Sequence, residues 1–287
     1  MVQDLAAAGF PVAVACRTLG VSRSGFYAWC ERPESARAAS DRDLLRQIKE
    51  IHALSRGTYG APRVQAELRL GRGIRVGRKR IARLMRNERL EGSYRRRFRR
   101  ATPSTATHPD HVKRVFTVDQ PDRLWVTDIT QHPTREGWVY AAVVIDVYSR
   151  RVVGLSIADH LKTELVIDAL EVARWRRRPE PGQTILHSDR GTQYTSWAFG
   201  HRLRQAGLLG SMGRVGSAYD NALCESFFAT LQRELLDTRS WTSREQLGQA
   251  IFEYIEAWYN PHRRHSRLGY ESPVSYEQTR RAEVVPA

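Results

Sequence analysis

Three acidic residues stand where a carboxylate could do chemistry. Asp128 interrupts the strand-like run Leu-Trp-Val-Thr-Asp-Ile-Thr, Asp189 follows the short apolar run 184–186, and Glu225 belongs to a segment with helical apolar spacing. The intervals between them hold 60 and 35 residues. Carboxylates are hard oxygen ligands of the kind Mg²⁺ accepts, whereas a zinc site would show His and Cys. A site for divalent metal ions is therefore the hypothesis that these residue types raise.

Each acid also has a structural interpretation. Asp is disfavoured inside a strand, so Asp128 is either a bulge or edge feature or a functional group on a rigid platform. Glu225 falls at the edge of the apolar stripe of its helix, near Asn221 and Gln232, with no Lys or Arg one turn away. Glu225 is therefore either an ordinary surface residue or a carboxylate whose charge a bound metal ion neutralises.

The elements that carry the acids follow an α/β order. Strands are predicted at 124–130, 138–148 and 151–157, then a helix at 163–177, a strand that ends before Asp189, and further helix and strand segments. The helix of Glu225 is predicted to start at Asp220 or Asn221. A last helix is predicted from a capping box of Thr242 and Glu245. This order predicts a sheet that holds the acids at strand ends and on one helix.

Two further residues near the acids need a role. Asp146 could be a fourth catalytic acid, but we favour a carboxylate that caps its turn or pairs with Arg150 or Arg151. His187 lies two residues before Asp189. We interpret it as a neighbour that orients a ligand rather than as a metal ligand itself.

Four motifs carry a resemblance to a known family. They are Trp-Val-Thr-Asp-Ile-Thr, His-Ser-Asp-Arg-Gly-Thr-Gln-Tyr, Asn-Ala-Leu-Cys-Glu-Ser-Phe-Phe, and Tyr259-Asn260 with Arg263, His265, Ser266 and Leu268. In this order, and over nearly the whole chain, they resemble the transposases of the insertion sequence three family. The most similar pattern is that of its second-reading-frame (OrfB) protein, which has a retroviral-integrase-type catalytic core.

The resemblance implies an RNase H-like fold, a mixed five-stranded sheet with helices, in which Asp128, Asp189 and Glu225 form an Asp-Asp-Glu triad. Asp128 would bridge two Mg²⁺ (or Mn²⁺) ions, with Asp189 on one ion and Glu225 on the other. Two such ions can activate an oxygen nucleophile and stabilise a leaving oxygen at phosphorus. Water would then cleave the donor DNA, and a DNA 3′-hydroxyl would carry out strand transfer.

The resemblance also implies partners. These would be transposon ends and target DNA, a homo-oligomer on that DNA, and an upstream-frame (OrfA-type) protein or fusion. One position departs from the family pattern, which has Lys or Arg seven residues after the Glu, because this chain has Gln232 there. Arg233 is rotated about 100° away on a helix. The alternative functions are an RNase H-like nuclease that does not join DNA and a DNA-binding regulator with a weak or inactive core.

The formal net charge of +15 asks for an acidic partner. Residues 1–120 hold 25 Lys and Arg against 11 Asp and Glu, whereas the remainder is close to neutral. This distribution favours polyanion binding by the first part and chemistry by the second.

Two helix-turn-helix patterns are predicted in the basic part. In residues 1–34, helix 12–18 is followed by a turn and by a helix that Ser22 caps. In residues 41–100, a helix starts at Asp41 or Asp43 after a polar, Ala-rich spacer, a second restarts around Pro62, and a third is basic. The candidate DNA contacts are Arg23, Ser24 and Tyr27 in the first pattern, and Arg78, Lys79, Arg80 and Arg83 in the second.

The segment after these patterns is predicted to connect two domains. Arg95, Arg96 and Arg97 belong to a basic run that could bind phosphates or serve as a tether. Residues 101–111 are predicted as a linker and 112–280 as the catalytic core.

The cysteines and the apolar runs indicate where in the cell the protein is expected. Cys16, Cys30 and Cys224 are odd in number and far apart, so neither a disulfide framework nor a structural zinc site is expected. No apolar run reaches the roughly 20 residues of a membrane helix, and the first residues do not form a signal peptide. We expect no membrane partner and a place in the cytoplasm, associated with the nucleoid.

Overall fold

The computed structural model describes residues 1–93, 118–189, 191–212 and 222–284. The chain divides into two compact units, residues 1–50 and 51–287. The domain boundaries predicted from the sequence stay predictions. None of the described helices is long and apolar enough to cross a membrane.

The first unit is helical and confirms the elements of the first predicted pattern. Its helices are α1 (Val2–Ala7), α2 (Val12–Thr18), α3 (Arg23–Glu31) and the first part of α4 (Ala36–Leu54). The Ser22 side chain accepts the N–H of Gly25 at 3.0 Å, as predicted. The predicted start of α4 at Asp41 or Asp43 is wrong, because Ser35 accepts the N–H of Ala38 at 3.1 Å and alanine favours helix.

Two more helices follow at the start of the second unit, α5 (Ala61–Gly71) and α6 (Arg78–Asn87). Pro62 lies in the first turn of α5, as predicted, where its missing N–H costs nothing. Three apolar side chains of α6 are buried, namely Ile81, Leu84 and Met85. The basic residues of this helix therefore remain on its outer side.

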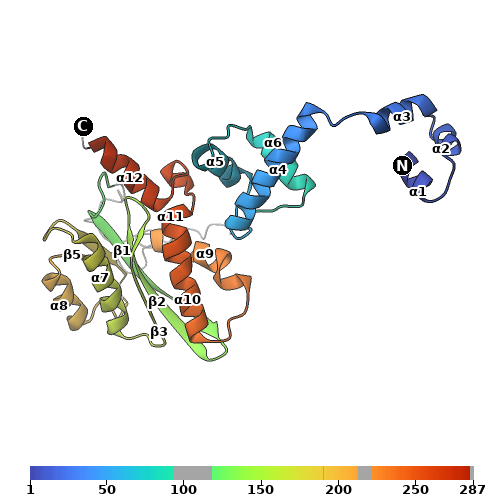
Figure 1. The fold of residues 1–287 in the computed structure, drawn as a ribbon. Coiled ribbons are helices and arrows are strands. Elements are labelled where there is room, and N and C mark those ends of the chain that lie inside the picture. Colours follow the sequence, from blue (N-terminus) through green and yellow to red (C-terminus); the bar gives the residue numbers. More distant parts are fainter. Residues whose placement is uncertain (94–117, 190, 213–221, 285–287) are drawn as a thin grey trace, which may run out of the picture. The chain divides into compact units, whose positions relative to one another are not determined.

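A mixed five-stranded sheet forms the centre of the second unit (Figure 1), which confirms the predicted fold class. The strands are β1 (Leu124–Thr134), β2 (Gly137–Asp146), β3 (Val152–Ala158), β4 (Ile185–Ser188) and β5 (Leu209–Met212). Their order is β3-β2-β1-β4-β5. The first three are antiparallel neighbours, and β4 pairs parallel with both β1 and β5.

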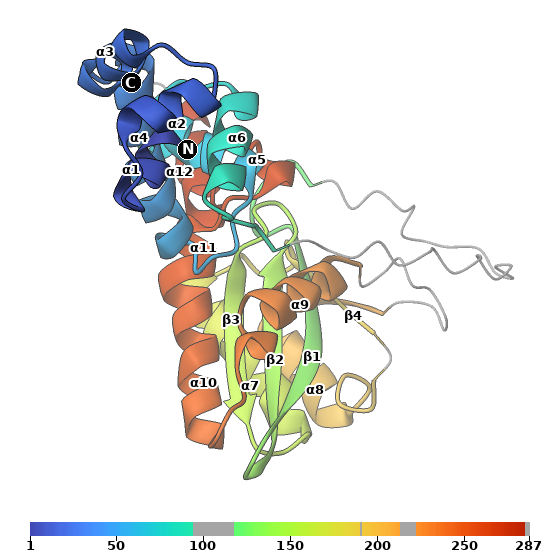
Figure 2. The ribbon, with the colours of Figure 1, turned by 90° about the vertical axis from the view of Figure 1, so that its right-hand side faces the viewer.

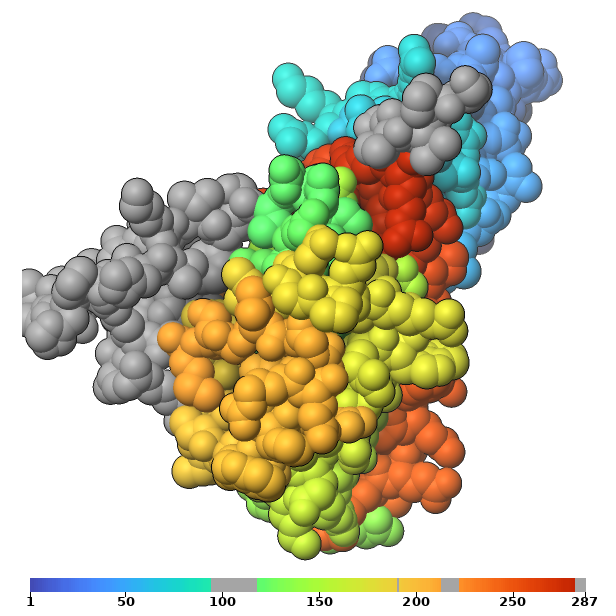
Figure 3. Space-filling model, turned by 90° about the vertical axis from the view of Figure 1, so that its left-hand side faces the viewer, coloured from blue at the N-terminus to red at the C-terminus, as the bar shows by residue number. Residues whose placement is uncertain are grey.

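Helices cover both faces of the sheet. On one face, α9 (Ala222–Glu234) and α10 (Arg244–Glu253) pack on Leu124 and Val126 of β1, and both helices lie in front of the strands in Figure 2. On the other face, α7 (Thr163–Arg177) and α8 (Trp197–Gln205) pack around Trp125. The space-filling view shows this second face, with α8 in orange (Figure 3). Alternate side chains of β1 therefore enter two different cores, as a period of two requires.

The C-terminal part continues from α9 through short elements. These are η1 (Leu236–Thr238), α10, a π-helical segment η2 (Tyr254–Tyr259), α11 (Asn260–His262), η3 (Ser266–Leu268) and α12 (Pro273–Val284). The predicted capping box of α10 is shifted by one residue. Ser243 accepts the N–H of Gln246 at 3.1 Å, while the Gln246 side chain accepts the N–H of Thr242.

Asp146 is fully buried at the end of β2 and caps its turn, as predicted. Its Oδ1 accepts the N–H of Tyr148 at 2.8 Å, and its Oδ2 accepts the N–H of Asp122 at 3.2 Å. Of the two predicted alternatives the turn cap is formed, whereas no ion pair of Asp146 with Arg150 or Arg151 is found among the described residues. Its cationic neighbour is Arg177, 3.4 Å away, because the C-terminal end of α7 reaches this buried turn.

The titration of Asp146 predicts a pH-dependent stability. Burial and the charge of Asp122 raise the pKa of Asp146 to about 7, against the effect of Arg177. An unfolded Asp titrates near 4, so the folded chain holds this extra proton between about pH 4 and 7. The free energy of unfolding should therefore fall, on account of this group, as the pH rises through that window.

Replacing Asp146 with Asn should remove that contribution, because an amide does not ionise. Urea unfolding of the two proteins at several pH values measures the difference in slope. Asp168→Asn, at an exposed position on α7, is the control and should keep the wild-type slope. Identical slopes for Asp146→Asn and wild type would contradict the prediction.

Candidate active site

Asp128 lies on β1 just beyond the point where β1 and β4 stop pairing. The parallel pairing of β1 with β4 ends at Val126 and His187, and Asp128 follows two residues later. Strand alternation places it on the face of Val126, which packs against α9. Its Oδ1 accepts the N–H of Ile129 at 2.8 Å. The strand thus holds a half-buried carboxylate at the edge of the α9 core.

Asp189 follows β4 directly, also two residues beyond the last pair with β1. It is exposed, and its Oδ1 accepts the N–H of Gly191 at 2.9 Å. A Cβ at position 191 would lie only 3.0 Å from that oxygen. Glycine is therefore the residue that allows the chain to turn so closely around the carboxylate.

Tyr194 fixes this turn to the sheet. Its ring is buried in the α7 and α8 core, and its hydroxyl lies 3.3 Å from the hydroxyl of Thr127, the neighbour of Asp128. Burial raises the pKa of Tyr194 well above its usual value, and the charges of Asp128 and Asp189 raise it further. The sequence analysis did not predict a role for Tyr194. Only its position as the last residue of the second motif could have indicated one.

Glu225 stands in the first turn of α9 and is exposed. Its exposure fits the interpretation of Glu225 as a surface residue, and the predicted place at the edge of the apolar stripe is wrong. The buried side chains of α9 include Cys224, Phe227 and Leu231, and a step of about 100° from Cys224 turns Glu225 outward.

The charges of the three acids act on one buried thiol. Cys224 is completely buried, which raises its pKa well above the usual value, and the charges of Asp128, Asp189 and Glu225 each raise it further. Two strand ends and one helix thus contribute negative charge around this thiol. Within the described residues, however, no group of three His, Cys, Asp or Glu is placed so that it could hold a metal ion.

The other predicted site residues have separate surroundings. His187 is buried, and its Nδ1 lies 3.0 Å from Ser211 Oγ on β5. The side chain of Gln232 donates to that of Asp237 in η1. Asn221 lies outside the described residues, as does the predicted basic run with Arg95, Arg96 and Arg97.

The candidate DNA contacts lie on helices in both units. Arg23, Ser24 and Tyr27 are exposed on α3. On α6, Arg78, Lys79 and Arg83 are exposed and Arg80 is half-buried. Because each set lies on a helix, its side chains have fixed relative positions, as contacts with bases or phosphates require.

The fourth motif, near residue 260, clamps the C-terminal part to the sheet. The Asn260 side chain accepts the N–H of Val152 and donates to the carbonyl of Val152, both at 2.9 Å. It thereby bonds like a neighbouring strand at the start of the edge strand β3. Tyr259 packs edge-on against Phe227 of α9, with ring centroids 4.9 Å apart.

A buried ion pair completes this clamp. Arg263 Nε and Nη2 donate to the two carboxylate oxygens of Glu234, at 2.9 and 2.7 Å, and Tyr254 donates to the same group at 2.8 Å. Burial alone would raise the pKa of Glu234, but Arg263, Arg63 and Tyr254 together hold the pKa below its usual value. The last turn of α9, the helix of Glu225, is therefore fixed by a charged group of the fourth motif.

Family models match most of the chain. Residues 39–98 match the model of an HTH-like domain, and residues 118–218 and 207–273 match two models of an integrase core domain. Among solved structures, the HTLV-2 integrase catalytic core domain in complex with magnesium (trimeric form) is 16% identical, with a TM-score of 0.42. That match covers 55% of this chain and 97% of the solved chain.

Curated relatives match over almost their whole length. An uncharacterized 31 kDa protein of insertion element IS600 from Shigella sonnei is 41% identical over 92% of this chain and 97% of its own. Transposase InsF for insertion sequence IS3A from Escherichia coli K12 is 38% identical over 94% of this chain and 95% of its own. The transposase for IS629 from Shigella sonnei is 37% identical, over 94% and 92%. With these identities, and with an integrase core behind an HTH-like region, the chain belongs to the IS3 family of insertion-sequence transposases.

Proposed function

We propose that the chain cleaves and joins DNA with Asp128, Asp189 and Glu225 as its catalytic triad. Membership of the family makes the protein a transposase, a polynucleotidyl transferase that acts in DNA transposition and integration. The assignment of the triad rests on the position of Asp128 and Asp189, each two residues beyond the last pair between β1 and β4. The charges of all three carboxylates also raise the pKa of the buried thiol of Cys224.

The residue types fit a divalent cation, although no three described acids stand at metal-binding distance. Three carboxylates and no thiolate suit Mg²⁺ or Mn²⁺ rather than zinc. Such ions, when bound, supply an activated oxygen nucleophile and stabilise the leaving oxygen. The chain supplies the three ligands from rigid elements, with Asp189 held by the Gly191 turn and the helix of Glu225 held by Arg263.

The two basic helical regions are proposed to bring DNA to this site. On α6, Arg78, Lys79 and Arg83 line the exposed side of a helix whose apolar side is buried. Phosphate contacts of this kind fix the register of a protein on a duplex. Oligomer formation on DNA and an upstream-frame partner or fusion are proposals that rest on the family alone.

Removal of the metal tests this function. Incubated with Mg²⁺, the upstream-frame protein and a duplex that carries the terminal repeats, the full chain should nick the ends and join them to target DNA. Excess chelator should abolish both reactions, and restored Mg²⁺ should recover them. Cleavage without joining would favour the nuclease alternative, and DNA binding with neither reaction would favour the regulator.

A further inference from the structure

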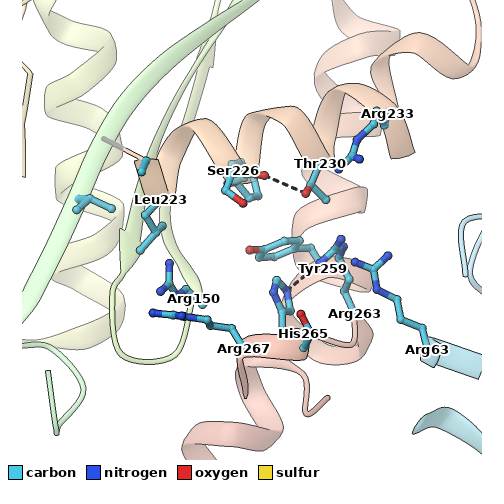
Figure 4. A pocket seen from close by; sticks show the side chains of 14 residues that line it. Arg63, Arg150, Leu223, Ser226, Thr230, Arg233, Tyr259, Arg263, His265 and Arg267 are labelled. Carbon is cyan, nitrogen blue, oxygen red and sulfur yellow. Dashed lines mark hydrogen bonds between the residues drawn. The ribbon is translucent and has the colours of Figure 1, made fainter. Parts of the chain in front are cut away.

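A basic pocket lies beneath α9, apart from the three acids. It has a volume of about 480 Å³, within the usual range of ligand sites. Its lining includes five arginines from separate segments and no acidic side chain, and Figure 4 shows how they lie. These are Arg63, Arg150, Arg233, Arg263 and Arg267. We call this group the arginine pocket.

Three of these arginines form no ion pair within the described part of the chain. Arg63 and Arg263 both approach Glu234, at 3.5 and 2.7 Å. Arg233 donates to the carbonyl of Ala229 at 2.8 Å. The other two, Arg150 and Arg267, are drawn next to each other at one end of the pocket in Figure 4. Burial and the charge of Arg267 lower the pKa of Arg150, so the two guanidinium groups repel each other.

The neighbouring imidazole of His265 is subject to the charges of the same arginines. Burial and the charges of Arg263, Arg63 and Arg150 hold the pKa of His265 well below its usual value. His265 is therefore neutral near pH 7 and adds no further charge. An anion in the pocket would reduce the repulsion among the arginines, and several planar guanidinium groups match the geometry of a phosphate.

The pocket and Asp128 lie on the same face of β1, because Val126 lines the pocket and Asp128 follows it by two residues. Ala222, Ser226, Thr230 and Arg233 line the pocket from one stripe of α9. At 100° per residue, Glu225 lies about 95° from the middle of this stripe, so its side chain points away from the pocket. Val126 and Asp128 are about 7 Å apart along the strand, which equals the rise of about two nucleotides. A strand that passes the acids could thus place a different phosphate, some nucleotides away, in the pocket.

We propose that the arginine pocket binds a backbone phosphate of the DNA substrate, some nucleotides from the phosphate at which the acids act. This inference rests on the proposed function, because it requires DNA at the triad. Arg150, held by the β2–β3 turn with a φ of 62°, and Arg267, in η3, are the residues assigned to the phosphate. The C-terminal motif would then contribute to DNA binding as well as to folding.

Arginine footprinting tests the proposal. The full chain is treated with phenylglyoxal, which modifies exposed guanidinium groups, and modification is mapped by mass spectrometry. A terminal-repeat duplex at ten times its Kd should slow modification of Arg150 and Arg267 about tenfold, as expected for a site occupied in that ratio. Arg281, exposed on α12 and not part of the pocket, is the control and should react at an unchanged rate.

The outcomes separate this inference from the proposed function. Protection of Arg78 without protection of Arg150 and Arg267 would leave DNA binding intact and overturn the pocket assignment. Absence of protection at all arginines would overturn both. Equal protection by inorganic phosphate would indicate a free-anion site, and equal protection by polyglutamate an acidic protein partner. Either result would overturn the DNA assignment.

Variants give an independent measurement. Arg150→Gln/Arg267→Gln should reduce the slope of log binding constant against log salt by about 0.9 for the lost phosphate, with Arg281→Gln unchanged. Arg267 is exposed, so the single variant Arg267→Gln keeps the test valid if the double variant is unstable. An unchanged slope in folded Arg267→Gln, with Arg267 unprotected in the wild type, would overturn the proposal.

Discussion

Replacing Asp128 with Asn should abolish Mg²⁺-dependent cleavage and joining while leaving the fold and DNA binding intact. Asn keeps the size of the side chain and can still accept the N–H of Ile129, but it loses the charge that a metal ion requires. We expect a loss of at least about 10²-fold, the effect of removing one group that stabilises charge in a transition state. Asp189→Asn should behave alike. Gel assays of nicked and joined products measure both.

The control is Asp146→Asn, which removes a buried carboxylate away from the three acids. It should change stability and retain most of the joining activity. Anisotropy with a labelled terminal-repeat duplex shows whether each variant still binds DNA, and urea unfolding shows whether it folds. Full activity of pure Asp128→Asn protein would exclude the proposed triad.

The second large effect concerns folding. Arg263→Met should lower the free energy of unfolding by about 3–5 kcal/mol, because it leaves Glu234 buried without its main partner. The loss should lie toward the lower end, since Arg63 also stands 3.5 Å from Glu234. Urea unfolding of both proteins measures the difference.

A double variant separates the ion pair from the packing around it. In Glu234→Leu/Arg263→Met no buried charge remains, and most of the lost stability should return. The exposed pair of Arg244 and Asp159, at 3.3 Å, provides the matched control, where Asp159→Asn should cost less than about 1 kcal/mol. Similar losses at both pairs, or no recovery in the double variant, would show that the buried pair does not fix α9.

Some elements of the structure could be predicted from the sequence, and others could not. The period of two in β1 and the apolar spacing of α7 depend on neighbouring residues only, and the strands and helices expected there are confirmed. The outward position of Glu225 was missed because Thr230 and Glu234 are buried on α9 together with Cys224, although Thr and Glu are not expected in an apolar stripe. Their burial depends on β1 and on the fourth motif, which are remote in sequence.

The same limit applies to the partners of charged groups. The residue types around Asp146 favoured the nearby Arg150 and Arg151, whereas Arg177 comes from the end of α7. The clamp at Asn260 reaches across 108 residues to Val152. Motif order revealed that residues near 260 matter, but only the fold reveals that they hold α9 and line a basic pocket.

The two hydrogen bonds between Asn260 and Val152 also affect the tendency of the protein to aggregate. An edge strand such as β3 presents backbone groups that another chain can extend, which is a common route to aggregation. At the start of β3, the side-chain amide of Asn260 already occupies both the N–H and the C=O of Val152. The first position at which a foreign strand could attach is therefore taken by the chain itself. Two copies of the chain can thus meet in solution without joining their sheets at this position.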